Sequence, residues 1–177
     1  LLLCGTVGPQ PLIDSVISIA DLIIKRKGER YRSRKLNSIF FDFANIGFDT
    51  SKCKYEWTTS DTEAAKMIEN DPKQDFIFTA AGFKDLFKLV KLANSDKLIK
   101  TVPKDLPILF FSGSDDPVGE KGIGVKRAVK LYKAQKIKDV TCKLYEKCRH
   151  EMLREKNKKQ VFKDILDWIE LVRFGEE

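Results

Sequence analysis

At 177 residues, the chain is long enough for one domain with a hydrophobic core, or for one domain that carries a sizeable insertion. Hydrophobic residues make up 42% of it and charged residues 33%, a composition typical of soluble globular proteins. The net charge of +7 comes from 33 basic and 26 acidic residues that are interspersed along the chain, which argues against a nucleic-acid-binding protein.

Cysteine and histidine are few and scattered. The four cysteines, Cys4, Cys53, Cys142 and Cys148, have no short paired spacing, and His150 is the only histidine. This pattern argues against a structural zinc site and against a disulfide framework. Reduced thiols favour a cytoplasmic protein.

The longest apolar run is too short for a membrane-spanning helix, because Asp14 and Asp21 interrupt it before the roughly 18 residues that a span needs. The chain starts without methionine, in the middle of an apolar stretch. We therefore expect it to be a fragment whose first half lies elsewhere.

Residues 1–4 read as a short buried strand, and residues 5–9 as a loop of small residues that ends it. Apolar residues cover most of the circumference of a helix over residues 12–25, so we expect this helix to be buried on most sides. A dense basic cluster follows, which could contact an anionic membrane surface. Its members are Lys25, Arg26, Lys27, Arg30, Arg32, Arg34 and Lys35.

Eight of the twelve phenylalanines lie between positions 40 and 87, in a region without a convincing strand. Residues 36–48 show no clean strand period. Thr59, Ser60 and Asp61 give an N-cap signal for a helix that continues to Ile68, and a further helix is expected over residues 84–93. Most of these rings must pack in a core, but some could line an apolar pocket for a lipid-like ligand.

The last part of the chain alternates strands and helices. We expect a buried strand over residues 107–112, a helix over 121–133, a strand near a sheet edge over 139–145, and a helix over 158–173 that docks on the sheet. Strand, helix, strand is the parallel crossover unit, so the sequence predicts an α/β fold.

Polar residues follow both of these strands. The turn after the first strand contains Asp115 and Asp116, and His150 lies just past the second. The carboxyl ends of adjacent parallel strands meet at one edge of a sheet, where ligands and catalytic groups gather. A carboxylate that binds one imidazole nitrogen leaves the other nitrogen free to act as a base, although an Asp-rich turn with solvated side chains and a structural histidine remain alternatives.

Residues 107–153, PILFFSGSDDPVGEKGIGVKRAVKLYKAQKIKDVTCKLYEKCRHEML, resemble the C-terminal part of the monoacylglycerol lipase and lysophospholipase-like α/β-hydrolases of bacteria, which are often grouped with serine aminopeptidases. The family's Gly-Ser-x-Asp-Pro turn falls on residues 113–117, so the resemblance implies Asp116 as the triad acid, and it implies His150 as the base. Similarity extends to residues 1–5 as a sheet strand, and to 57–61 and 75–86 in the cap. Lys147 and Cys148 depart from the family, which commonly has two small residues there.

The resemblance implies an α/β-hydrolase core formed by residues 1–8 and 99–177, with residues 9–98 as a helical cap. It implies a serine hydrolase, an esterase that cleaves carboxylic esters of lipid-like small molecules, of the monoacylglycerol or lysophospholipid type, without metal or cofactor. No Gly-x-Ser-x-Gly occurs in the chain, so the nucleophile and the oxyanion hole are expected in the missing N-terminal half, and this fragment alone should be inactive. Alternatives are a peptidase, an epoxide or haloalkane hydrolase, and a non-catalytic binding scaffold.

Overall fold

The computed structural model describes residues 1–74 and 76–175. Its centre is a parallel sheet in the order β1-β2-β3, formed by β1 (Leu2–Cys4), β2 (Ile108–Gly113) and β3 (Val140–Tyr145). Leu3 pairs with Phe110, and Phe110 with Cys142, so all three strands end at the same edge. The predicted parallel α/β arrangement is confirmed.

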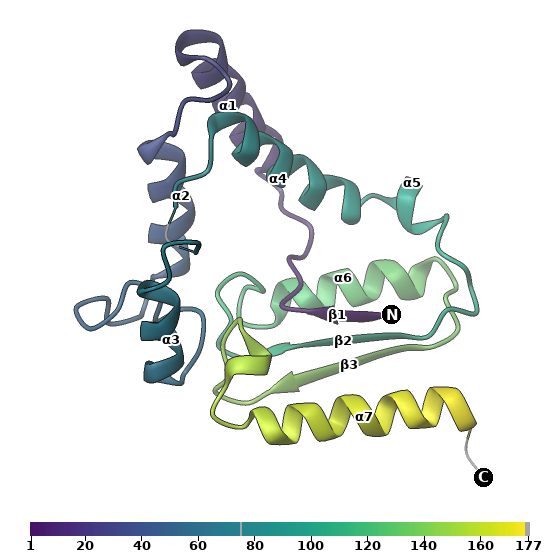
Figure 1. Cartoon of the computed structure of the whole chain (residues 1–177). Coiled ribbons are helices and arrows are strands. Elements are labelled where there is room, and N and C mark those ends of the chain that lie inside the picture. The colour runs from purple at the N-terminus through teal and green to yellow at the C-terminus, as the bar shows by residue number, and fades with distance from the viewer. Residues whose placement is uncertain (75, 176–177) are drawn as a thin grey trace.

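Helices cover both faces of the sheet (Figure 1). Helix α6 (Ile123–Ala134) packs on one face through the predicted Val125, Ala128 and Val129. Helix α7 (Lys158–Phe174) lies on the other face and contributes Val161 to a buried cluster with Leu109. Every residue of β2 is buried, because β2 is the central strand and a helix covers each of its faces.

The long connection between β1 and β2 is helical and lies partly beyond the carboxyl ends of the strands and partly alongside the β1 edge of the sheet (Figure 1). It contains α1 (Ile13–Lys27), α2 (Arg34–Ala44), α3 (Thr62–Glu69), α4 (Ala80–Ala93) and α5 (Asp96–Ile99). Asp61 caps α3 as predicted, accepting hydrogen bonds from the backbone of Glu63 and Ala64. Helix α4 begins earlier than expected, where the Thr79 hydroxyl accepts from Gly82 N–H. The division into core and cap at residues 8 and 99 stays a prediction.

Three predictions of burial were wrong. Helix α1 was expected to be buried on most sides, but Ala20 is its one fully buried residue among those described, because α1 packs mainly along α4. Strand β1 is exposed at Leu2 and Cys4, since among the described strands it pairs with β2 alone. The end of α7 leaves Ile169 and Val172 exposed rather than docked on the sheet.

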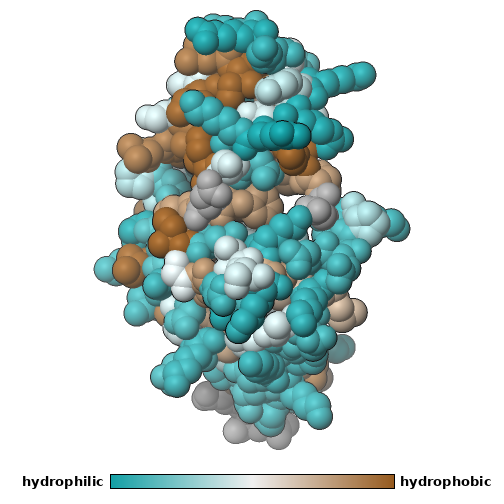
Figure 2. Space-filling model, turned by 90° about the vertical axis from the view of Figure 1, so that its left-hand side faces the viewer, coloured by the Kyte–Doolittle hydropathy of each residue, from teal (hydrophilic) through white to brown (hydrophobic). Residues whose placement is uncertain are grey.

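The surface is mixed in character. On the face shown in Figure 2, apolar patches lie among hydrophilic residues in the upper and middle parts, and the lower part is mostly hydrophilic. All seven members of the basic cluster at residues 25–35 are exposed. Within residues 1–74 and 76–175, none of the helices has the length and apolar character required to cross a bilayer.

Candidate active site

The acidic turn after β2 holds one carboxylate in a fixed position. Asp116 is fully buried, and its two oxygens accept hydrogen bonds from the Val118 N–H at 2.9 Å and the Ser112 hydroxyl at 2.9 Å. The neighbouring Asp115 instead accepts from the Ser114 hydroxyl at 3.1 Å. Of the two adjacent carboxylates after β2, that of Asp116 is therefore buried and that of Asp115 is partly exposed.

The structure brings Asp116 and His150 together across 34 positions of sequence. Nδ1 of His150 lies 3.2 Å from Oδ1 and 3.1 Å from Oδ2 of Asp116. The imidazole is 26% exposed and the carboxylate is not exposed at all. With Nδ1 facing the carboxylate, Nε2 is the nitrogen left to exchange a proton with another group.

Two glycines, one directly after β1 and one at the end of β2, allow the backbone there to approach the loop after β3. Gly5, with φ of +57°, lies so close to His150 that a Cβ there would be 2.8 Å from Cε1 and 2.9 Å from Nδ1. A Cβ on Gly113 would lie 1.9 Å from the carbonyl oxygen of Cys148. The backbone at Gly5 thus packs directly against the imidazole, and the backbone at Gly113 packs against the loop that carries it. Only glycine permits such close contact at these two positions.

The electrostatic surroundings of His150 favour its protonated form overall. Burial lowers the pKa of the imidazole, but the hydrogen bond and the negative charge of Asp116, with the charge of Glu151, outweigh burial and raise the pKa above its ordinary value of 6.5. A carboxylate that stabilises an imidazolium is what a general base needs once it has accepted a proton.

Residues 56–60, here called the docking segment, join the helices of the β1–β2 connection to the loop after β3. This loop, residues 146–151, carries His150 and is here called the histidine loop. The ring of Trp57 lies 5.4 Å from the ring of His150, centroid to centroid. The Glu151 N–H donates to the carbonyl of Thr58 at 2.6 Å, and Arg149 forms an ion pair with Glu56 at 2.7 Å. Nε1 of Trp57 is buried and has no hydrogen-bond partner in the part of the chain that the structure describes.

Cys148 has the environment of an inert thiol. It is 4% exposed, and its Sγ donates to Asn157 at 3.2 Å. Burial, with the charge of Glu155, raises the pKa of the thiol, which opposes formation of a nucleophilic thiolate. The four cysteines are free, and none forms a disulfide.

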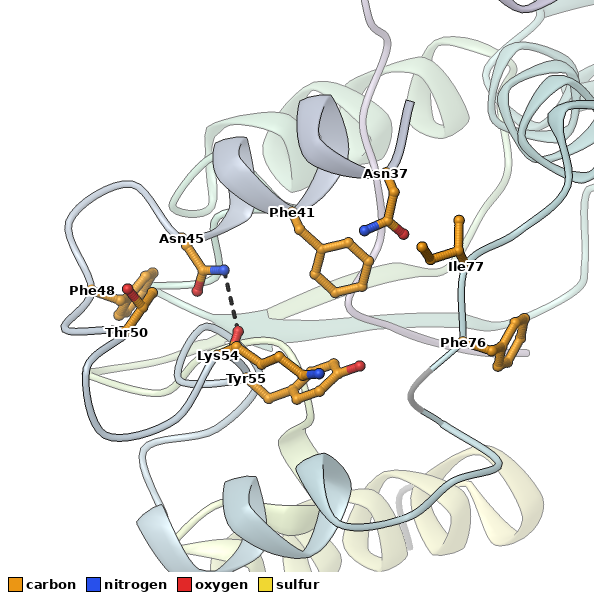
Figure 3. Close-up of a pocket in the computed structure, with 9 residues that line it drawn as sticks. All are labelled: Asn37, Phe41, Asn45, Phe48, Thr50, Lys54, Tyr55, Phe76 and Ile77. Carbon is orange, nitrogen blue, oxygen red and sulfur yellow. Dashed lines mark hydrogen bonds between the residues drawn. The ribbon is translucent and has the colours of Figure 1, made fainter. Parts of the chain in front are cut away.

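A cavity of about 470 Å³ opens in the β1–β2 connection, between α2 and residues 48–55 and 76–77 (Figure 3). Its walls are Asn37, Phe41, Asn45, Phe48, Thr50, Lys54, Tyr55, Phe76 and Ile77. The amide oxygens of Asn37 and Asn45 are buried and lack hydrogen-bond partners among the described residues. Neither Asp116 nor His150 lines this cavity; Phe41 contacts Trp57, which in turn contacts His150.

Several side chains around the histidine were not predicted from the sequence. Glu155 is fully buried and binds the docking segment, although glutamate usually lies at the surface. Arg149 was not singled out, and no local pattern marks either residue. Gly5 and Trp57 lie in stretches that resemble the family, but their contact with His150 follows only from the folded structure. Asp75, the first residue of the expected stretch 75–86, lies outside the described residues.

A parallel sheet flanked by helices, with a carboxylate after one strand and a histidine after the next, defines a partial α/β-hydrolase fold. The sequence model of the family described as serine aminopeptidase, S33, matches residues 2–157, and the chain belongs to this family. A search of curated proteins found no match.

Solved structures with the same fold include esterases and lipases. A thermostable carboxyl esterase from Bacillus coagulans, solved with glycerol, matches 97% of this chain and 56% of its own, with 22% identity and a TM-score of 0.86. A soluble variant of monoglyceride lipase from Saccharomyces cerevisiae, solved with a substrate analog, matches 97% of this chain and 55% of its own, with 20% identity and a TM-score of 0.65. The chain thus spans little more than half the length of these proteins. The likeness to these structures shows that the chain has their fold.

Proposed function

We propose that this chain supplies the acid and the base of a serine hydrolase that cleaves carboxylic esters of lipid-like molecules, of the monoacylglycerol or lysophospholipid type. The observation that carries the proposal is the buried Asp116 within 3.1 Å of Nδ1 of His150, at the carboxyl edge of a parallel sheet. The serine nucleophile and the oxyanion donors would come from outside residues 1–177, since the sequence contains no Gly-x-Ser-x-Gly.

In this mechanism, a serine attacks the ester carbonyl while Nε2 of His150 accepts the proton of its hydroxyl. Asp116 accepts the Nδ1–H hydrogen bond, which fixes the tautomer and stabilises the imidazolium. His150 then donates the proton to the leaving alcohol, and a water molecule that it activates hydrolyses the acyl-enzyme. No step requires a metal or an organic cofactor.

Three aromatic side chains beside His150 support an apolar substrate. Trp57 contacts the imidazole, and Phe40 and Phe41 pack edge-on against Trp57. Large apolar side chains of this kind line pockets for lipid-like ligands. A peptidase is the second candidate, because the family is described by its serine aminopeptidases.

Substrate preference tests the proposal in the protein that carries the nucleophile. We expect a fluorophosphonate probe to label the protein, and p-nitrophenyl esters of long acyl chains to be hydrolysed with higher kcat/KM than short ones, since each additional buried CH₂ contributes about 0.8 kcal/mol. Amino-acid p-nitroanilides should be poor substrates. Failure of the probe to react would identify a binding scaffold, and faster cleavage of the anilides would favour the peptidase.

The pH dependence of kcat/KM should report the titration of His150. The base must be neutral to accept a proton, and its pKa is raised by Asp116 and Glu151 above 6.5. We therefore expect activity to fall as pH decreases through a value above 6.5, and the acid limb of a kcat/KM profile to give that value. A limb in the range of an ordinary carboxylate would contradict the role of His150.

A further inference from the structure

Glu155 is a charged residue in an unusual position. Its carboxylate is fully buried, five positions after His150 and within a short turn that follows the histidine. Burying a carboxylate is costly unless hydrogen bonds satisfy its oxygens. The donors around Glu155 therefore indicate what this carboxylate does.

The carboxylate of Glu155 joins two separate segments. The Arg149 N–H donates to Oε1 at 2.6 Å, from the residue directly before His150. The Ser60 N–H lies 3.1 Å from both oxygens, and the Ser60 hydroxyl donates to Oε2. Among the described residues, the donors to Glu155 are all neutral groups, so the carboxylate acts as a bridge between backbones rather than as one half of an ion pair.

The backbone of His150 is held on both sides by this arrangement. Before the histidine, the Arg149 N–H is bound by Glu155; after it, the Glu151 N–H is bound by the carbonyl of Thr58. The Arg149 guanidinium extends in the other direction and donates to the carbonyl of Thr59 at 3.0 Å. The backbone N–H groups of both residues that flank the histidine are thus tied to the docking segment, directly or through Glu155.

We propose that Glu155 is a positioning residue for His150, which keeps Nδ1 directed at Asp116 only while the docking segment lies against the histidine loop. The alignment of the base then depends on the docking segment, which leads into α3. The inference rests on the proposed function, in which His150 is the general base.

The charges of Asp116 and Glu151 raise the pKa of His150. Glu155→Gln removes a charge as well as a hydrogen-bond acceptor, so a variant that changes no charge is needed to isolate the effect of moving the imidazole. When Nδ1 is displaced from Asp116, the interactions that raise the pKa weaken while burial still lowers it, so the pKa of His150 falls.

The experiment compares the complete protein with its Glu155→Gln variant by NMR titration of His150, whose signal is assigned by its loss in His150→Gln. Glutamine keeps the shape of the glutamate side chain, but its NH₂ group cannot accept a hydrogen bond. This group would therefore face one of the N–H donors from which the carboxylate accepts. We expect a lower pKa for His150, loss of the Nδ1–H resonance shared with Asp116, and a decrease in kcat of about 10²-fold with KM unchanged. Near-UV circular dichroism checks that the variant is folded.

Two further variants separate positioning from general stability. Ser60→Ala removes one hydrogen bond to Glu155 without changing any charge, and should lower the His150 pKa by a smaller amount. Glu69→Gln is the matched control, since Glu69 also accepts from a backbone N–H, that of Lys54 at 3.1 Å, and should leave the His150 signals unchanged. If Glu155→Gln destabilises the protein while the folded form keeps the native His150 pKa and Nδ1–H signal, Glu155 has a structural role only.

The NMR readout does not depend on ester hydrolysis. Normal turnover in His150→Gln would therefore overturn the proposed function. An unchanged His150 signal in both Glu155→Gln and Ser60→Ala would overturn the positioning role, even with the proposed function intact.

Discussion

In the complete protein that carries the nucleophile, replacing Asp116 with Asn should lower ester hydrolysis by about 10⁴-fold at neutral pH, because the substitution forces the wrong tautomer on His150. The Val118 N–H can only donate, so the amide oxygen of Asn would stay at the position of Oδ1. The amide nitrogen then takes the position of Oδ2, where the Ser112 hydroxyl can rotate to accept from it. From there the nitrogen also donates to Nδ1 of His150, which places the ring proton on Nε2 and removes the base.

The neighbouring carboxylate provides a matched control. Asp115→Asn changes the same chemical group one position earlier, but Asp115 binds Ser114 rather than the imidazole, so kcat should remain close to that of the unchanged protein. His150→Ala should cost about as much as Asp116→Asn or more, since residues that act as a unit are not additive. Equal effects of the two Asp substitutions would contradict the assignment of the acid.

Replacing Gly113 with Ala should destabilise the fold by about 3 kcal/mol or more and also disrupt the candidate site. The added Cβ would lie 1.9 Å from the carbonyl oxygen of Cys148 and 2.4 Å from that of Arg149. Both contacts are with backbone, which no side-chain rotation relieves. The histidine loop must move away from β2, and His150 moves with it.

Denaturant unfolding gives the change in stability, provided that the m-value is unchanged. Gly82→Ala is the control: its Cβ would meet the Phe78 ring at 3.2 Å, a side chain that can shift, and alanine favours the helix by up to about 1 kcal/mol. A Gly113→Ala protein as stable as the unchanged one would show that the two loops are farther apart than the structure places them.

Local sequence patterns predicted most elements of the sheet and its two covering helices. The apolar run of β2 and the stripe Val125, Ala128 and Val129 of α6 have unambiguous periods, and both are buried as expected. The pattern was less informative for α2, where adjacent phenylalanines obscure the helical period, although Ser33 caps the helix. Helix α5 has four residues and is too short to produce a period.

Burial could not be inferred from apolar composition alone. Helix α1 is apolar on most of its surface, yet Ile19 and Leu22 are exposed, because how much of a helix is covered depends on how many neighbours pack against it. Periodicity reports which face of an element is apolar. It does not report how many other elements reach that face.

By itself, the sequence determined that two adjacent parallel strands end in an acidic turn and in the only histidine, and the resemblance indicated Asp116 rather than Asp115. These features follow from short-range patterns. Only the tertiary structure revealed that Gly5 packs against the imidazole and that Glu155 joins Arg149 to Ser60. The segments that carry Ser60 and Glu155 are 95 positions apart, and a contact over such a separation depends on the path of the whole chain, which leaves no local signal in either segment.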